Sequence, residues 1–248
     1  MNGTAHRLAD VITMPARNAG TQAASAATGT VRQLRNWTTN EVDDWGRDDA
    51  FVRRIWSLSH LRWSTSVGGA EHVPKRTGAL IVVNARRFAL APVFAAIAIG
   101  ATVNRPVRFV GRPDIAPLGP IMQRLGALLP VEAELESALR AGELIVLGAS
   151  HTRTNLHSGV VDHQLVGSAV AAQVRVLPAA TMSVSLQRNA RVEIGGPIRL
   201  RHKRRGPLEE LKIADRLRAD INAVLDEMGG TMTGTPIDWL PNSWVARV

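Results

Sequence analysis

The sequence predicts an α/β domain in which a mostly parallel β-sheet is flanked by helices. Short apolar runs rich in β-branched residues occupy 79–83, 107–110, 144–147 and 174–177, and each is bounded by turn residues. Helical patterns alternate with them at 88–103, 117–128, 134–140 and 167–172. Strands that alternate with helices favour a parallel sheet covered on both faces. The length of 248 residues and the 45% hydrophobic content suit one such domain.

The segments outside this core differ in composition. Residues 1–40 are rich in Ala, Thr, Gly and Asn, so we expect a mobile tail. Apolar residues at helical spacing predict an amphipathic lead-in helix over 41–62. The main domain then spans 63–228, with short strands at 192–194 and 198–200 and a closing amphipathic helix at 208–228. Residues 229–248 form a C-terminal tail.

Composition excludes several classes of protein. The chain has no cysteine, which rules out disulfides, thiolate catalysis and zinc ribbons. We expect no metal site and no cofactor. No basic segment leads into an apolar core of signal-peptide length at the N-terminus. The uncharged run at 88–103 is shorter than the roughly 20 residues that span a bilayer, so a buried helix is preferred and an interfacial one comes second.

The turn after the run at 79–83 is a candidate site, because sites in α/β folds lie where strands end. Its sequence, Asn84 to Pro92, resembles a motif of the glycerophospholipid acyltransferases, the superfamily that acylates glycerol 3-phosphate and 1-acylglycerol 3-phosphate. That family has Asn-His, four residues and Asp, with the His as general base. Asn84 matches, but Ala85 stands in place of the His. Leu90 stands in place of the Asp, or Pro92 if the spacing is longer. The resemblance therefore implies a catalytic site without its base.

Other blocks extend the resemblance over about residues 63–228. In these blocks too, the positions that build the fold match the family, whereas the residues that perform its chemistry are replaced. The phosphate-binding block resembles 109–132, but where the family often closes it with Val-Asp-Arg, this chain reads Val131-Glu132-Ala133. The third block has Ser150 where the family has Glu, and only Thr152 and Arg153 remain. The segment at 42–48 resembles the lead-in of actinobacterial members. The candidate substrate-binding residues are Asn84, Arg86, Arg112, Arg124, Thr152 and Arg153.

Two further groups of residues admit a functional and a plain interpretation. His157 and Asp162 repeat the His, four residues, Asp spacing, but we expect them in a solvent-exposed loop. Ser150, His151, Asp162 and His163 could form a nucleophile or metal site, although their spacing matches no zinc pattern and chance clustering is favoured.

The cluster of Arg201, Lys203, Arg204 and Arg205 suits anionic headgroups as well as it suits a solvated loop. The formal charge of +9 likewise favours anionic partners.

The resemblance implies a catalytically impaired acyltransferase homologue at the cytoplasmic face of the cell membrane. Its expected partners are acyl-CoA, acyl carrier protein, phospholipid, an anionic membrane surface or a second acyltransferase. The alternative is an active acyltransferase that moves an acyl group to a lysophospholipid or glycerol-phosphate hydroxyl. A nucleic-acid-binding protein is the least favoured hypothesis, because aromatic residues make up only 4% and tyrosine is absent.

Overall fold

The computed structural model describes residues 42–62, 64–85, 91–113, 116–150, 158–183, 189–200 and 206–229. The elements in chain order are α2 (Asp49–Arg62), β1 (Ser64–Gly68), η1 (Ala70–His72), β2 (Ala79–Val83), α3 (Ala91–Val103), β3 (Val107–Val110), α4 (Leu118–Arg124), β4 (Ala127–Leu128), α5 (Glu132–Arg140), β5 (Leu144–Gly148), α6 (His163–Ala171), β6 (Arg175–Ser183), β7 (Asn189–Ile194) and α7 (Pro207–Glu227).

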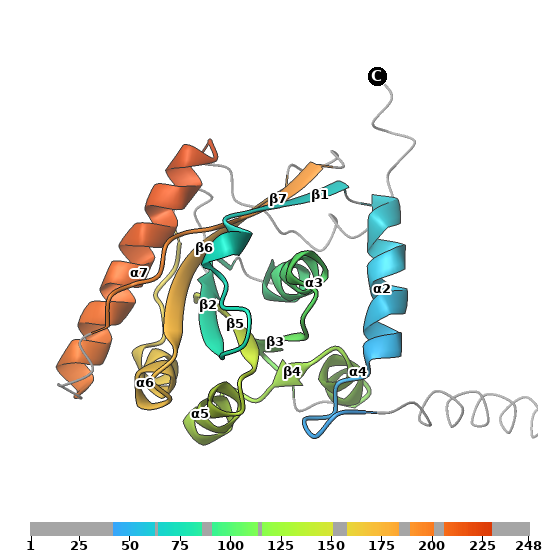
Figure 1. Cartoon of the computed structure of the whole chain (residues 1–248), viewed down its shortest axis with the longest axis horizontal. Coiled ribbons are helices and arrows are strands. Elements are labelled where there is room, and N and C mark those ends of the chain that lie inside the picture. Colours follow the sequence, from blue (N-terminus) through green and yellow to red (C-terminus); the bar gives the residue numbers. More distant parts are fainter. Residues whose placement is uncertain are drawn as a thin grey trace, which may run out of the picture. The chain divides into compact units, whose positions relative to one another are not determined.

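Seven strands form one sheet in the order β1-β7-β6-β2-β5-β3-β4 (Figure 1). The strands from β6 to β4 run parallel, whereas β7 pairs with β6 antiparallel and β1 is parallel to β7. The four strands expected from the sequence are neighbours, since Ile81 of β2 lies opposite Val146 of β5 and Leu177 of β6. The prediction of a mostly parallel sheet flanked by helices is confirmed.

Helices cover both faces of the sheet because its central strands are apolar on both sides. Ala79, Ile81 and Val83 of β2 face one core with α3, while Leu80 and Val82 face a second core. Helices α2 and α4 lie on the side of α3, and α5, α6 and α7 cover the opposite face (Figure 1). Strands buried on both faces are continuously hydrophobic, which is why the runs could be found in the sequence.

Helix α3 is a buried core helix, as the sequence predicted. It carries no charged side chain, and eight of its thirteen residues are buried. Among the helices of the described residues, none combines the length and the apolar character needed to cross a bilayer.

The lead-in helix begins later than predicted, at Asp49 rather than at residue 41. Residues 42–48 form a turn in which the Asp43 carboxylate accepts hydrogen bonds from the backbone N–H groups of Trp45 and Arg47. Gly46 adopts a positive φ of 83° in this turn. The Asp48 carboxylate then accepts from the N–H of Phe51 and starts the helix. The turn at Gly46 and the cap at Asp48 therefore prevent α2 from starting earlier in the chain.

Other elements also differ from the sequence prediction: α5 begins at Glu132, β6 continues to Ser183 and β7 begins at Asn189, and three further differences have a local cause. The helix expected at 117–128 ends at Arg124, because Gly126 turns the chain with a φ of 99° and residues 127–128 pair with β3 as β4. Helix α6 begins at His163 instead of residue 167, since Asp162 caps it. The segment 198–200 is not a strand, although the N–H of Ile198 donates to the carbonyl of Val176.

Candidate functional site

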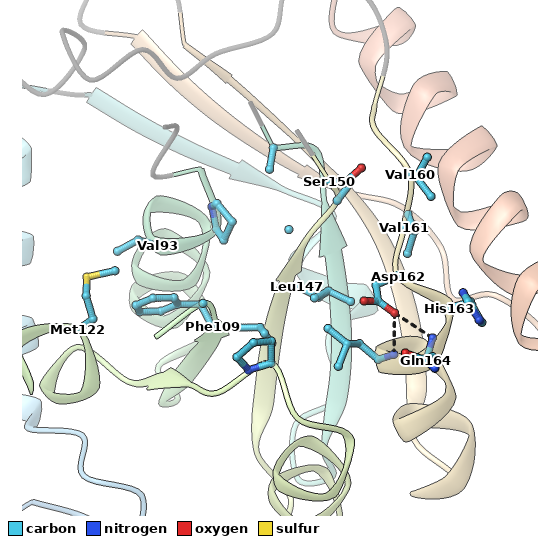
Figure 2. A pocket seen from close by; sticks show the side chains of 18 residues that line it. Val93, Phe109, Met122, Leu147, Ser150, Val160, Val161, Asp162, His163 and Gln164 are labelled. Carbon is cyan, nitrogen blue, oxygen red and sulfur yellow. Dashed lines mark hydrogen bonds between the residues drawn. The ribbon is translucent and has the colours of Figure 1, made fainter. Parts of the chain in front are cut away.

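A cavity of about 720 Å³ opens at the carboxyl ends of β2, β3 and β5 (Figure 2). The connection leaving β2 passes through α3 on one face of the sheet, and the connection leaving β5 passes through α6 on the other. In open α/β sheets, ligand crevices form where successive connections leave toward opposite faces. The cavity therefore lies where the topology favours a site.

The methyl group of Ala85 lines this cavity at the end of β2, where it meets the start of α3 and the end of β5. A Cβ built on Gly148 would lie 2.7 Å from Cγ of Pro92 and 3.3 Å from Cβ of Ala85. Only glycine at position 148 lets these segments approach so closely. Pro92 lies in the first turn of α3, where a missing N–H costs nothing. Ala85 and Pro92, two of the positions that correspond to the expected catalytic pair, are thus packed together at the wall of the cavity.

The opposite wall comes from the segment that leads into α6. The backbone N–H of Ser150 donates to the carbonyl of Val160 over 2.7 Å. A side chain on Gly159 would collide with the backbone of Ser150, with a Cβ only 1.7 Å from its carbonyl oxygen. This close approach of two backbones places Ser150 and residues 160–165 on one cavity.

Asp162 and His163 line the cavity, and Asp162 is solvent-exposed at the end of a loop, as expected. Its side chain is exposed, but it is fixed as the N-cap of α6 by the N–H groups of Gln164 and Leu165. Figure 2 shows the carboxylate turned toward this first helical turn, with the His163 ring on the side away from Ser150. Among the described residues, no group of three His, Cys, Asp or Glu side chains could hold a metal ion.

Asn84 has a structural role that the sequence did not predict. Its side chain is buried, and its Oδ1 accepts from the backbone N–H of Thr181 at 2.7 Å and from the Thr181 hydroxyl at 3.2 Å. Its Nδ2 donates to the Thr181 carbonyl at 3.1 Å. The amide continues the pairing of β2 with β6 beyond the last backbone pair, Val83 with Ala179. These bonds hold the Asn84 amide in the sheet, and Asn84 is not among the residues that line the cavity.

Two of the candidate substrate-binding residues, Arg112 and Arg124, are not among the residues that line the cavity. Arg124 pairs with the buried carboxylate of Asp48 at 2.5 Å, and its guanidinium lies 5.0 Å from the ring centre of Phe51. It holds α4 against the start of α2 because a buried carboxylate needs a cationic partner. Arg112 is half-buried just past the end of β3.

The remaining candidates lie outside the described residues. They are Arg86, Leu90, His151, Thr152, Arg153, His157, Arg201, Lys203, Arg204 and Arg205, and with them the tails at 1–40 and 230–248. Their expected roles stay predictions.

The apolar wall of the cavity was not predicted from the sequence. Val93, Phe109, Met122, Leu147 and Leu165 line it together with the polar side chains at its rim. The signal was present, because each of these residues lies near a strand end or in the first turns of a helix that follows one. A wall of this kind suits an alkyl chain better than a polar substrate.

The sheet order, the helices on both faces and the cavity at the strand ends define an α/β protein whose ligands would enter at the carboxyl edge of the sheet. Neither a family model nor a curated protein matches the sequence. Among solved structures, the chain is similar to the 1-acyl-sn-glycerophosphate (LPA) acyltransferase PlsC from Thermotoga maritima, with a TM-score of 0.54 and 16% identity. The match covers 74% of this chain and 79% of that one. The fold is therefore acyltransferase-like.

Proposed function

We propose that this chain is an acyltransferase-like protein of membrane lipid metabolism that binds acyl or phospholipid ligands without the family's His-dependent catalysis. The observation that carries the proposal is Ala85, whose methyl group lines the cavity where a general base would have to face a substrate hydroxyl. A methyl group accepts no proton, so the ~10²- to 10⁴-fold contribution of general-base catalysis is missing.

The apolar wall supports the choice of ligand. Burying an alkyl chain stabilises a complex by about 0.8 kcal/mol for each CH₂ group, so a cavity of this lining favours acyl-CoA, acyl carrier protein cargo or a lysophospholipid. Arg86 and Arg153 follow the cavity residues Ala85 and Ser150 closely in the sequence, and we assign to them the pairing with the ligand's phosphate. The protein acts at the cytoplasmic face of the membrane, either alone or with a partner acyltransferase.

An active acyltransferase is the second candidate, because Ser150, Asp162 and His163 line the same cavity. The His163 ring lies on the side away from Ser150 (Figure 2), so the three side chains are not aligned as nucleophile, base and orienting group. This arrangement favours the impaired homologue.

Ligand binding is tested with a fluorescent acyl-CoA and a fluorescent lysophosphatidic acid. Ala85→Trp should place an indole in the cavity at the end of β2 and weaken saturable binding, whereas Leu208→Trp, at an exposed position of α7 that does not line the cavity, should leave it unchanged. Equal affinities for both variants and the unaltered chain would show that the ligand does not bind in this cavity.

Catalysis is tested by release of free coenzyme A from acyl-CoA in the presence of lysophosphatidic acid. The unaltered chain should form no product above an Arg153→Ala control. The double changes Ala85→His with Leu90→Asp, or Ala85→His with Pro92→Asp, should restore weak activity at most. Turnover by the unaltered chain that is lost on substituting His151, His157 or His163 would establish the active enzyme instead.

A further inference from the structure

The amino-terminal edge of the sheet carries two adjoining cavities that are independent of the cavity beside Ala85. One, of about 360 Å³, is lined by residues of α2, α3 and the start of β3. The other, of about 750 Å³, is lined by the segments that enter β2, β3 and β6. Asn104 and Arg105 line both. The Ala85 cavity lies at the carboxyl ends of the parallel strands, which is the opposite edge of the sheet. A single ligand group therefore cannot occupy both places at once.

The lining of these two cavities is strongly basic. Six cationic side chains face two carboxylates, those of Asp49 and Glu71. We call the six the basic edge: Arg47, Arg53, Lys75, Arg76, Arg105 and Arg175. Within the described part of the chain, Lys75, Arg76 and Arg175 form no ion pair, and all three are exposed. Their charges are therefore available to a ligand.

Arg105 fixes the floor of the basic edge. Its Nη1 donates to the carbonyl of Pro74 at 2.5 Å and to that of Thr77 at 3.3 Å, and its Nη2 donates to the carbonyl of Gly142 at 2.9 Å. These bonds tie together the segments entering β2, β3 and β5. Because the acceptors are neutral carbonyls, the positive charge of Arg105 is not cancelled. The cavity thus has a rigid, cationic floor.

Arg47 is a buried cation with unsatisfied donors. The residue is 8% exposed, and within the described residues its Nε and Nη1 have no hydrogen-bond partner. Its nearest anion is the largely exposed carboxylate of Asp49, 3.3 Å from Nη1. Burial lowers the pKa of Arg47, and the neighbouring Arg108 acts in the same direction while Asp49 raises it. Because the charge of Arg47 is paired with one largely exposed carboxylate, an anion in the adjoining cavity would add to the stabilisation of this buried cation.

We propose that the basic edge is a second binding site, which takes a ligand bearing a phosphate-type anion. Several arginines around a concave, rigid floor suit phosphate oxygens, which accept paired N–H donors in the plane of the guanidinium. The phosphate belongs either to a soluble phosphorylated molecule or to the headgroup of a phospholipid. The site does not depend on the function assigned to the Ala85 cavity.

The test compares two triple variants of the full chain that remove equal charge. K75A/R76A/R175A removes three exposed members of the basic edge. R54A/R199A/R218A removes three exposed arginines that line neither cavity. Inorganic pyrophosphate, titrated by calorimetry at low salt, probes the soluble source. Vesicles of phosphatidylcholine with or without phosphatidic acid probe the headgroup source.

We expect saturable binding of pyrophosphate, of phosphatidic acid vesicles, or of both. The basic-edge triple should weaken that binding at least about tenfold, since each lost charge-assisted hydrogen bond corresponds to roughly that factor. The matched triple should change it less than about threefold. Binding by vesicles alone identifies the headgroup as the source. Equal losses in both triples would show diffuse attraction to a cationic chain, and that result, like the absence of saturable binding in both arms, overturns the proposal.

Discussion

Replacing Asn84 by Ala separates a structural role from a role in ligand binding. The change removes three hydrogen bonds between the Asn84 amide and Thr181 in the sheet interior. Each hydrogen bond contributes about 0.5–1.5 kcal/mol to stability. We therefore expect the free energy of unfolding to fall by about 3 kcal/mol, which lowers Tm by roughly 6–12 °C in a domain of this size.

Urea denaturation followed by circular dichroism measures this loss. Asn222→Ala provides a graded comparison, because the Asn222 side chain accepts one hydrogen bond, from the N–H of Ser158, and its loss should cost about 1 kcal/mol. The reasoning is refuted if Asn84→Ala changes stability by less than 1 kcal/mol while the affinity for acyl-CoA or lysophosphatidic acid collapses. That outcome would show that Asn84 binds substrate and contributes little to stability.

Three other substitutions test contacts elsewhere in the fold, each by urea denaturation. Asp48→Ala removes a helix cap and a buried ion pair and should cost about 3 kcal/mol, whereas the exposed Asp44→Ala should stay within about 0.5 kcal/mol. Gly148→Ala places a Cβ 2.7 Å from the ring of the proline that lies in the first turn of α3, so we expect a loss of about 1–3 kcal/mol. Gly196→Ala, which meets nothing within 4 Å, should be nearly neutral. Arg105→Met breaks bonds to three carbonyl groups and should cost about 2 kcal/mol; an unchanged stability would show that these bonds do not hold the strand entries together.

The central strands could be predicted because burial on both faces leaves a continuous apolar run in the sequence. The edge strands could not. Residues 64–68 are Ser-Thr-Ser-Val-Gly, and they form β1 only because β7 offers a partner for each of them. Residues 127–128 form β4 through pairing with β3 after a glycine turn. Such strands depend on neighbours that are distant in the chain, and local pattern carries little trace of them.

The position of the candidate site could be predicted, but the roles of its polar residues could be predicted only in part. Strand ends and the resemblance located Ala85 and Ser150, and both line the cavity. Asn84 and Arg124 were expected to touch substrate because they lie in blocks that resemble the acyltransferase motifs. Their actual partners, Thr181 and Asp48, are 97 and 76 positions away in the chain. Only the folded chain shows that these groups are already occupied.

The placement of β2 has a consequence for motion near Ala85. All five residues of β2 are buried, and the strand lies between β5 and β6 at the centre of the sheet. Amides in such a position exchange with solvent hydrogen only when the whole domain opens, so β2 should be among the last segments to take up deuterium. Position 85 is thereby anchored to the slowest part of the molecule. A ligand in the cavity meets one wall that does not adjust to it, and discrimination between ligands at that wall depends on their shape.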